Sequence, residues 1–142
     1  MSDKLMWTVV GGMCLAGASW GQNVVVNGDF EIPRINVLYE HIPYGSSRID
    51  GWQVDAPSAG QGVDIVNANF QPGIAKHGVQ AVDLAGSPGR GSIYQTFTTV
   101  SGATYIVSSW VSSNGGPFTA GASLAINGVN VVSIDSPQFP NW

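Results

Sequence analysis

The clearest structural signal in the chain is the sequence Ala122-Ser-Leu-Ala-Ile-Asn-Gly-Val-Asn-Val-Val-Ser-Ile134. Two apolar segments, 122–126 and 129–134, flank the dipeptide Asn127-Gly128. This dipeptide favours the two positive φ angles of a type I′ turn. The sequence therefore predicts a β-hairpin with one strand on each side of Asn127-Gly128.

Six further apolar segments of similar length occur along the chain, separated by Gly, Pro, Asn and Ser residues. They are 23–27, 51–54, 63–66, 80–84, 92–100 and 104–113. Short segments at this spacing are typical of a β-sandwich, and no window shows a sustained helical period. We therefore expect an all-β fold, with the long segment 33–50 as an irregular loop.

The charge of the chain excludes one class of partner. Charged residues make up 10% of the 142 residues, the net charge is −4, and Lys and Arg together number 5. Proteins that bind nucleic acids present clustered basic residues, whereas the basic residues here are scattered. We therefore expect no nucleic-acid partner.

The first 21 residues have the order of segments found in secretory signal peptides. Lys4 precedes an apolar run at 5–16, and small residues follow it. The run is shorter than the roughly 20 residues that a membrane span needs. We expect 1–21 to be removed on export, leaving a secreted or cell-surface domain, 22–142, with no membrane span and no Cys, since Cys14 is lost. The alternative for this segment is an amphipathic or buried N-terminal helix.

Alternation of side chains assigns faces to two of the predicted strands. In 92–100, Ile93 and Phe97 are expected in the core and Tyr94 outside. In 104–113, Trp110 is expected outside, and the core face comprises Tyr105, Val107, Ser109 and Val111. Trp52 is expected in the core.

Six blocks of the predicted mature chain form a recognisable pattern in their order and spacing. They are Asn23-Val-Val-Val-Asn-Gly-Asp-Phe-Glu-Ile-Pro33, Ile49-Asp-Gly-Trp-Gln-Val54, Gly62-Val-Asp-Ile-Val66, Gly78-Val-Gln-Ala-Val-Asp-Leu-Ala-Gly-Ser87, Ser92-Ile-Tyr-Gln-Thr-Phe-Thr-Thr-Val100 and Gly102-Ala-Thr-Tyr-Ile-Val-Ser108. The pattern resembles the bacterial choice-of-anchor C family, which is similar to the plant cell-wall family called domain of unknown function 642. The resemblance implies a galactose-binding-like jelly-roll β-sandwich in a secreted protein associated with cell-wall polysaccharides. It also implies closing strands beyond Trp142, so that 22–142 is a C-terminally truncated domain.

Aromatic and polar residues suggest a site for sugars. Sugar rings present apolar C–H faces that stack on aromatic rings, while Asp, Asn and Gln bind the hydroxyls. The candidate ligand-binding residues are Trp110 and Tyr94, expected to face outward on adjacent strands, Tyr39 and Tyr44 in the long loop, and Asp64 and Asp83 in mid-strand. The two Asp residues have two other interpretations. Their carboxylates could bond to the backbone or to a neighbouring strand, or they could be the carboxylate pair of a glycosidase.

Metal and catalytic sites have weaker signals. Asp29 and Glu31 flank Phe30, and galactose-binding-like folds often hold a structural calcium ion near the first strand with ligands of this kind. We expect no other cofactor. His41 and His77 are the only histidines, and the sequence contains no Gly-x-Ser-x-Gly motif of a nucleophilic serine.

We therefore expect a non-catalytic, exported carbohydrate-binding or cell-surface module whose partner is a polysaccharide or glycan. One alternative is a structural or adhesive extracellular protein that binds a cell-surface or cell-wall protein through Trp110. The other is a glycan-active hydrolase.

Overall fold

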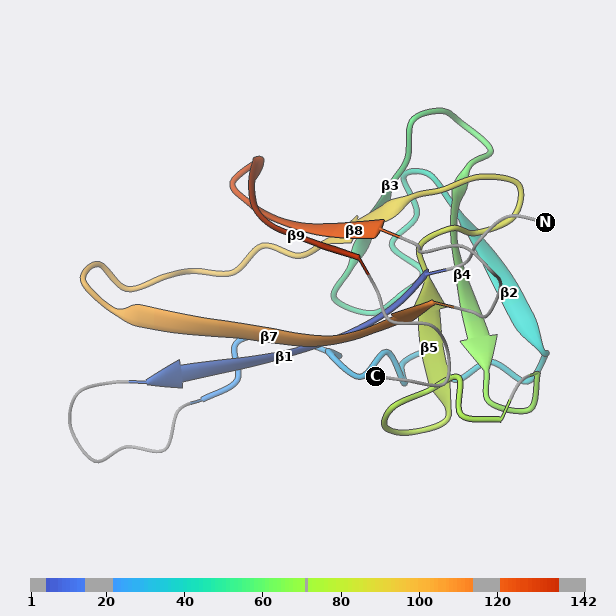
Figure 1. Ribbon diagram of the computed structural model, residues 1–142, viewed down its shortest axis with the longest axis horizontal. Coiled ribbons are helices and arrows are strands. Elements are labelled where there is room, and N and C mark those ends of the chain that lie inside the picture. The colour runs from blue at the N-terminus through green and yellow to red at the C-terminus, as the bar shows by residue number, and fades with distance from the viewer. Residues whose placement is uncertain (1–4, 15–21, 71, 114–120, 136–142) are drawn as a thin grey trace.

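The computed structural model describes residues 5–14, 22–70, 72–113 and 121–135, with only the backbone for 5–14. Within these ranges every regular element is a β-strand (Figure 1). The predicted all-β class is therefore confirmed. The same ranges hold no helix long and apolar enough to cross a membrane.

The described strands form three antiparallel sheets. The largest has the order β2-β4-β5-β1-β7, with β2 at Tyr39–Pro43, β4 at Gly62–Asn67, β5 at Gln80–Asp83, β1 at Leu5–Cys14 and β7 at Thr104–Ser113. Two smaller sheets pair β3 (Gln53–Asp55) with β6 (Ser92–Tyr94), and β8 (Gly121–Ile126) with β9 (Val129–Asp135).

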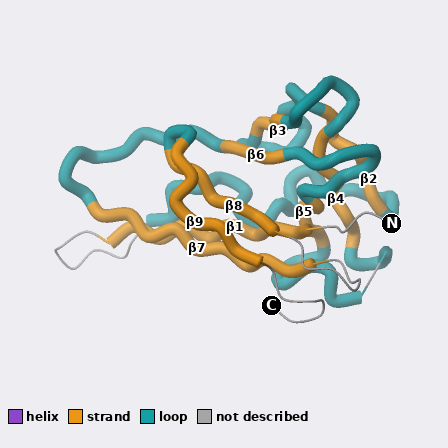
Figure 2. The backbone as a smooth tube through the Cα atoms, turned by 45° about the horizontal axis from the view of Figure 1, so that its top comes forward, coloured by secondary structure: helices purple, strands orange, loops and turns teal. Residues whose placement is uncertain are grey.

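The core lies between the five-stranded sheet and the β3–β6 pair, which Figure 2 shows above that sheet. Val54 of β3 and Ile93 of β6 pack in one cluster with side chains from the large sheet. The buried members of this cluster are Phe30, Ile35, Ile42, Ile49, Trp52, Val54, Val63, Ile65, Val82 and Val111. This two-layer packing is consistent with a β-sandwich. It also confirms the expected burial of Trp52.

The large sheet has a second, opposite face, which we call the outer face. Val63 and Ile65 of β4 belong to the core cluster, whereas Val66 packs in a separate cluster with Ala81 and Ile74. Because side chains alternate along a strand, the outer face also carries Tyr39, His41, Asp64, Asp83 and Trp110, as their register positions show.

Irregular segments on the core side are held by polar side chains. Gln80 is fully buried, and its amide group bonds to the Ile35 N–H and to the carbonyls of Phe30 and Pro33. Gln95 bonds in the same way to both backbone groups of Val26. Backbone groups taken out of water need partners, and here side chains supply what a strand neighbour supplies in a sheet.

Several elements differ from the sequence prediction, and β6 ends at Tyr94 although a strand was expected over 92–100. Residues 23–27 form no strand, because the Asn27 side chain bonds both backbone groups of Ile32 and a turn with positive φ at Asn27 and Phe30 follows. Residues 39–43, expected within a loop, form β2. The sequence signal for this strand was weak, because Ile42 is the only residue of β2 that is buried in the core.

The predicted faces hold only for part of the later strands. Val111 is buried, and Trp110 and Tyr94 are exposed, as expected. Phe97 and Val107 were expected in the core and are 42% and 41% exposed. Val107 lies in the half of β7 nearer Thr104, whereas burial in this strand is confined to its last three residues; Figure 1 shows that one end of β7 extends beyond β8 and β9. Phe97 lies after the end of β6 and so outside the alternating pattern.

The predicted hairpin at Asn127-Gly128 is confirmed. Strands β8 and β9 pair directly across it, and φ is 50° at Asn127 and 77° at Gly128. Gly128→Ala is expected to lower the free energy of unfolding by about 1 to 2 kcal/mol, because a Cβ is unfavourable at this φ. Gly128→Asn should lose less, since Asn tolerates this conformation. Urea denaturation of the three proteins measures the difference, and an unchanged midpoint for Gly128→Ala would contradict the turn assignment.

The segment predicted to direct export lies inside the large sheet. Residues 5–14 form β1, which pairs with β7 along its whole length and with β5 at Met6 and Trp7. The alternative of an N-terminal helix is therefore wrong for these residues. Export and cleavage of 1–21 remain predictions.

Candidate functional site

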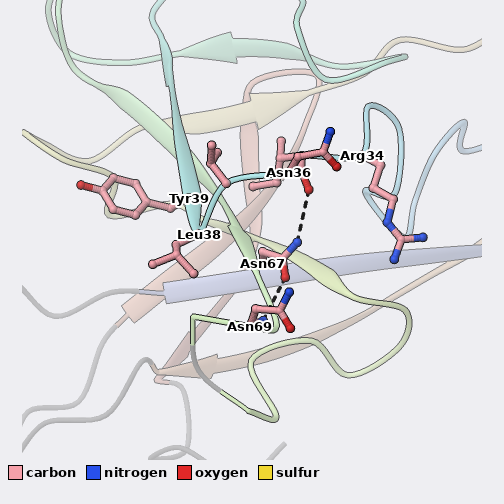
Figure 3. Close-up of a pocket in the computed structure, with 8 residues that line it drawn as sticks. Arg34, Asn36, Leu38, Tyr39, Asn67 and Asn69 are labelled. Carbon is pink, nitrogen blue, oxygen red and sulfur yellow. Dashed lines mark hydrogen bonds between the residues drawn. The ribbon is translucent and has the colours of Figure 1, made fainter.

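An open pocket of about 640 Å³ lies where the segment leading into β2 passes the end of β4 (Figure 3). In this view Asn67 lies below Asn36 and above Asn69, and Tyr39 and Arg34 lie on opposite sides. The pocket is lined by Arg34, Ile35, Asn36, Val37, Leu38, Tyr39, Asn67 and Asn69.

Hydrogen bonds fix the backbone frame of this pocket. The Asn67 N–H donates to the Leu38 carbonyl at 2.9 Å, and its side-chain amide donates to the Ile35 carbonyl at 3.3 Å. The Ile35 N–H donates to Gln80 Oε1 at 2.6 Å. The Asn69 N–H donates to Asn67 Oδ1 at 2.9 Å. Both sides of the pocket are thus tied to β4 and β5, so the pocket is formed before any ligand binds.

The pocket combines one aromatic side chain, Tyr39, with polar side chains. Tyr39 is 51% exposed and its ring meets that of Phe70 edge-on, with 6.1 Å between centroids. Arg34, Asn36 and Asn69 are exposed. Apolar ring surface beside amide and guanidinium groups is the chemistry that binds a sugar ring and its hydroxyls.

Sequence reasoning found only part of this pocket. Tyr39 was a predicted ligand residue and lines it. Arg34, Asn36, Asn67 and Asn69 were missed. A usable signal was the pair Asn67 and Asn69 at the end of a buried strand, directly before Phe70, because polar side chains at a strand end lie at a sheet edge.

The two aromatic residues expected to form one site are apart. Tyr94 lies on β6, which pairs with β3, whereas Trp110 lies on β7, which pairs with β1. The expectation that they occupy adjacent strands is therefore wrong. Tyr44 is 53% exposed but follows the opposite end of β2 from Tyr39, and it does not line the pocket.

Trp110 belongs to a different cluster on the outer face. The Lys76 ammonium lies 4.5 Å from the centroid of the indole ring, within the range of a cation–π interaction. The His77 ring meets the indole edge-on, with 6.3 Å between centroids. These contacts orient Trp110, which stays 40% exposed.

Asp64 and Asp83 are brought together, as direct partners on β4 and β5. Both are fully buried. Asp64 accepts hydrogen bonds from the Ser87 N–H at 3.1 Å and interacts with His41 Nδ1 at 2.8 Å. Asp83 accepts one from the Ala85 N–H at 2.9 Å. These backbone bonds match the structural interpretation of the two residues, because both carboxylates fix the loop that follows β5.

Glu31 also has a structural partner. Its Oε1 accepts hydrogen bonds from the N–H groups of Val79 and Gln80, at 2.7 and 2.9 Å. A Cβ at Gly78, where φ is +70°, would overlap this carboxylate. Asp29 is exposed in the turn before Phe30. The described side chains contain no group of three or more His, Cys, Asp or Glu placed to hold a metal ion. Calcium at Asp29 and Glu31 stays a prediction.

Comparison with protein-family models, with curated proteins and with solved structures found no significant match.

Proposed function

We propose that this chain is an exported, non-catalytic module of the galactose-binding-like jelly-roll type that binds a glycan in the pocket beside Tyr39. The two-layer antiparallel architecture supports the fold part of this proposal. The resemblance to the choice-of-anchor C family supports the extracellular setting. This resemblance is independent of the pocket geometry.

One observation carries the proposed binding activity. Tyr39, whose exposed ring meets that of Phe70, lies at one side of a pocket whose other side chains include three amides and a guanidinium group. The Asn67 side chain already hydrogen-bonds to the backbone of the pocket. Asn36, Asn69 and Arg34 therefore supply the groups for sugar hydroxyls. Few preplaced polar groups beside an aromatic surface are typical of small-ligand sites.

Tyr39→Ala is expected to weaken glycan binding by about tenfold or more, because it removes the ring on which the sugar stacks. The matched control is Tyr44→Ala, since Tyr44 is equally exposed, at 53% against 51%, but lies outside the pocket. A glycan array identifies the ligand, and titration calorimetry then measures the affinity of the wild type and both variants.

Two results would contradict the proposal. The first is a folded wild type that binds no glycan on the array. The second is an equal loss of affinity in Tyr39→Ala and Tyr44→Ala, because it would separate binding from this pocket. The unfolding midpoint of each variant shows that the chain is folded.

A structural or adhesive surface protein is the second candidate. The observation that favours it is the group of exposed apolar side chains on β7, β8 and β9, since contiguous exposed apolar surface often marks protein contacts. The residues are Ile106, Val107, Trp110, Ile126, Val129, Val131 and Val132. Hydrolysis has less support, because the carboxylates of Asp64 and Asp83 are buried and bonded to the backbone.

A further inference from the structure

Tyr39 and Trp110 lie on the same face of the large sheet and in the same row across its strands. Tyr39 pairs with Val66, and Val66 pairs with Ala81. Trp7 of β1 pairs with Val82 on one side and with Val111 on the other. One position further along β1, the same row of residues therefore runs from Ala81 across β1 to Trp110. Four strand spacings separate β2 from β7, which is about 19 Å at roughly 4.8 Å each.

Segments 68–70 and 72–79, which we call the outer loop, cover the sheet between these two residues. Ile74 is fully buried against Val66 and Ala81, and this contact fixes the middle of the loop. One end brings Phe70 against Tyr39, and the other brings Lys76 and His77 against Trp110. The loop therefore joins the two aromatic clusters into one surface.

The second cluster has the same chemistry as the first. Trp110 offers exposed indole surface, while the Lys76 ammonium and the His77 ring supply groups that hydrogen-bond to hydroxyls. Two such clusters held at a fixed separation favour a ligand that reaches both, since the second contact is made at high effective concentration.

We infer that the glycan site extends from Tyr39 over the outer loop to Trp110, and that its ligand is a polysaccharide chain of several units. This inference rests on the proposed function, and it applies to the chain that retains residues 5–14, because β1 lies between β5 and β7. It assigns Tyr39 and Trp110 to a single extended site, in which Lys76 and His77 are the neighbours that position Trp110.

The test measures affinity against ligand length. Dimers, tetramers and hexamers of β-1,4-glucan, β-1,4-xylan and β-1,4-galactan are titrated into the wild-type chain, Tyr39→Ala, Trp110→Ala and Tyr94→Ala. Tyr94 is the control, since it is 52% exposed and lies on the β3–β6 sheet. We expect the hexamer of the bound series to bind the wild type at least about tenfold more tightly than its dimer.

The variants separate the two ends of the site. Trp110→Ala should abolish the gain from dimer to hexamer, whereas Tyr39→Ala should weaken both ligands. Tyr94→Ala should match the wild type. A wild type that binds dimer and hexamer equally overturns the inference and leaves the proposed function intact. So does a Trp110→Ala variant that keeps the gain. Binding to no member of the three series and to no glycan on the array would contradict both.

Discussion

Phe30→Ala is expected to lower the free energy of unfolding by about 3 to 5 kcal/mol, the usual cost of removing a buried aromatic ring. Phe30 is fully buried in the core cluster, and its ring lies 5.3 Å from that of Trp52. The loss combines the burial of the ring with the cavity that it leaves. Guanidinium chloride denaturation followed by Trp fluorescence measures it.

Two variants test this explanation. Phe97→Ala removes a ring that is 42% exposed, so it should cost less than about 1 kcal/mol. Phe30→Gly removes the ring but also the unfavourable Cβ at a φ of 60°, so this variant should be no less stable than Phe30→Ala. Equal losses in Phe30→Ala and Phe97→Ala would contradict the placement of Phe30 in the core.

Gln80→Met should cost about 3 kcal/mol or more, although the two side chains have similar size. Methionine cannot replace the bonds to the Ile35 N–H and to the carbonyls of Phe30 and Pro33. Each buried backbone group left without a partner costs about 1 to 3 kcal/mol. Denaturation curves compare this variant with Gln53→Met, which changes a partly buried Gln of β3 and should stay close to the wild type.

The same substitution should also affect the pocket. Ile35 lines it, and Gln80 holds the backbone of Ile35. We therefore expect Gln80→Met to weaken glycan binding even at temperatures where the variant remains folded. An unchanged affinity in the folded variant would show that the pocket keeps its shape without this bond.

The sequence predicted the elements with strong local signals. The Asn127-Gly128 hairpin needs only local turn geometry, and the buried strands β4 and β5 have the apolar composition of the core. Strand β2 was missed because its Tyr, Glu and His residues resemble a polar loop, and its pairing with β4 depends on a partner about twenty or more positions away. The strand predicted at 23–27 was wrong, because the backbone of Val26 bonds to the Gln95 side chain and not to a neighbouring strand.

The candidate site was predictable only in part, for a related reason. Exposed aromatic residues can be proposed from composition, and Tyr39 was. Which of them share a surface depends on strand order, and this order places β7 beside β1 and β6 beside β3. Tyr94 and Trp110 follow each other closely in the chain and still belong to different sheets. Tyr39 and Trp110 are far apart in the chain and share one face.

Removal of residues 1–21 on export would take β1 out of the large sheet. Residues 5–14 complete the middle of this sheet, where they pair with both β5 and β7. A molecule that has lost them carries two unpaired strand edges, on β5 and on β7, and such edges recruit other strands. Whatever strand replaces them has to enter between β5 and β7 and run antiparallel to both.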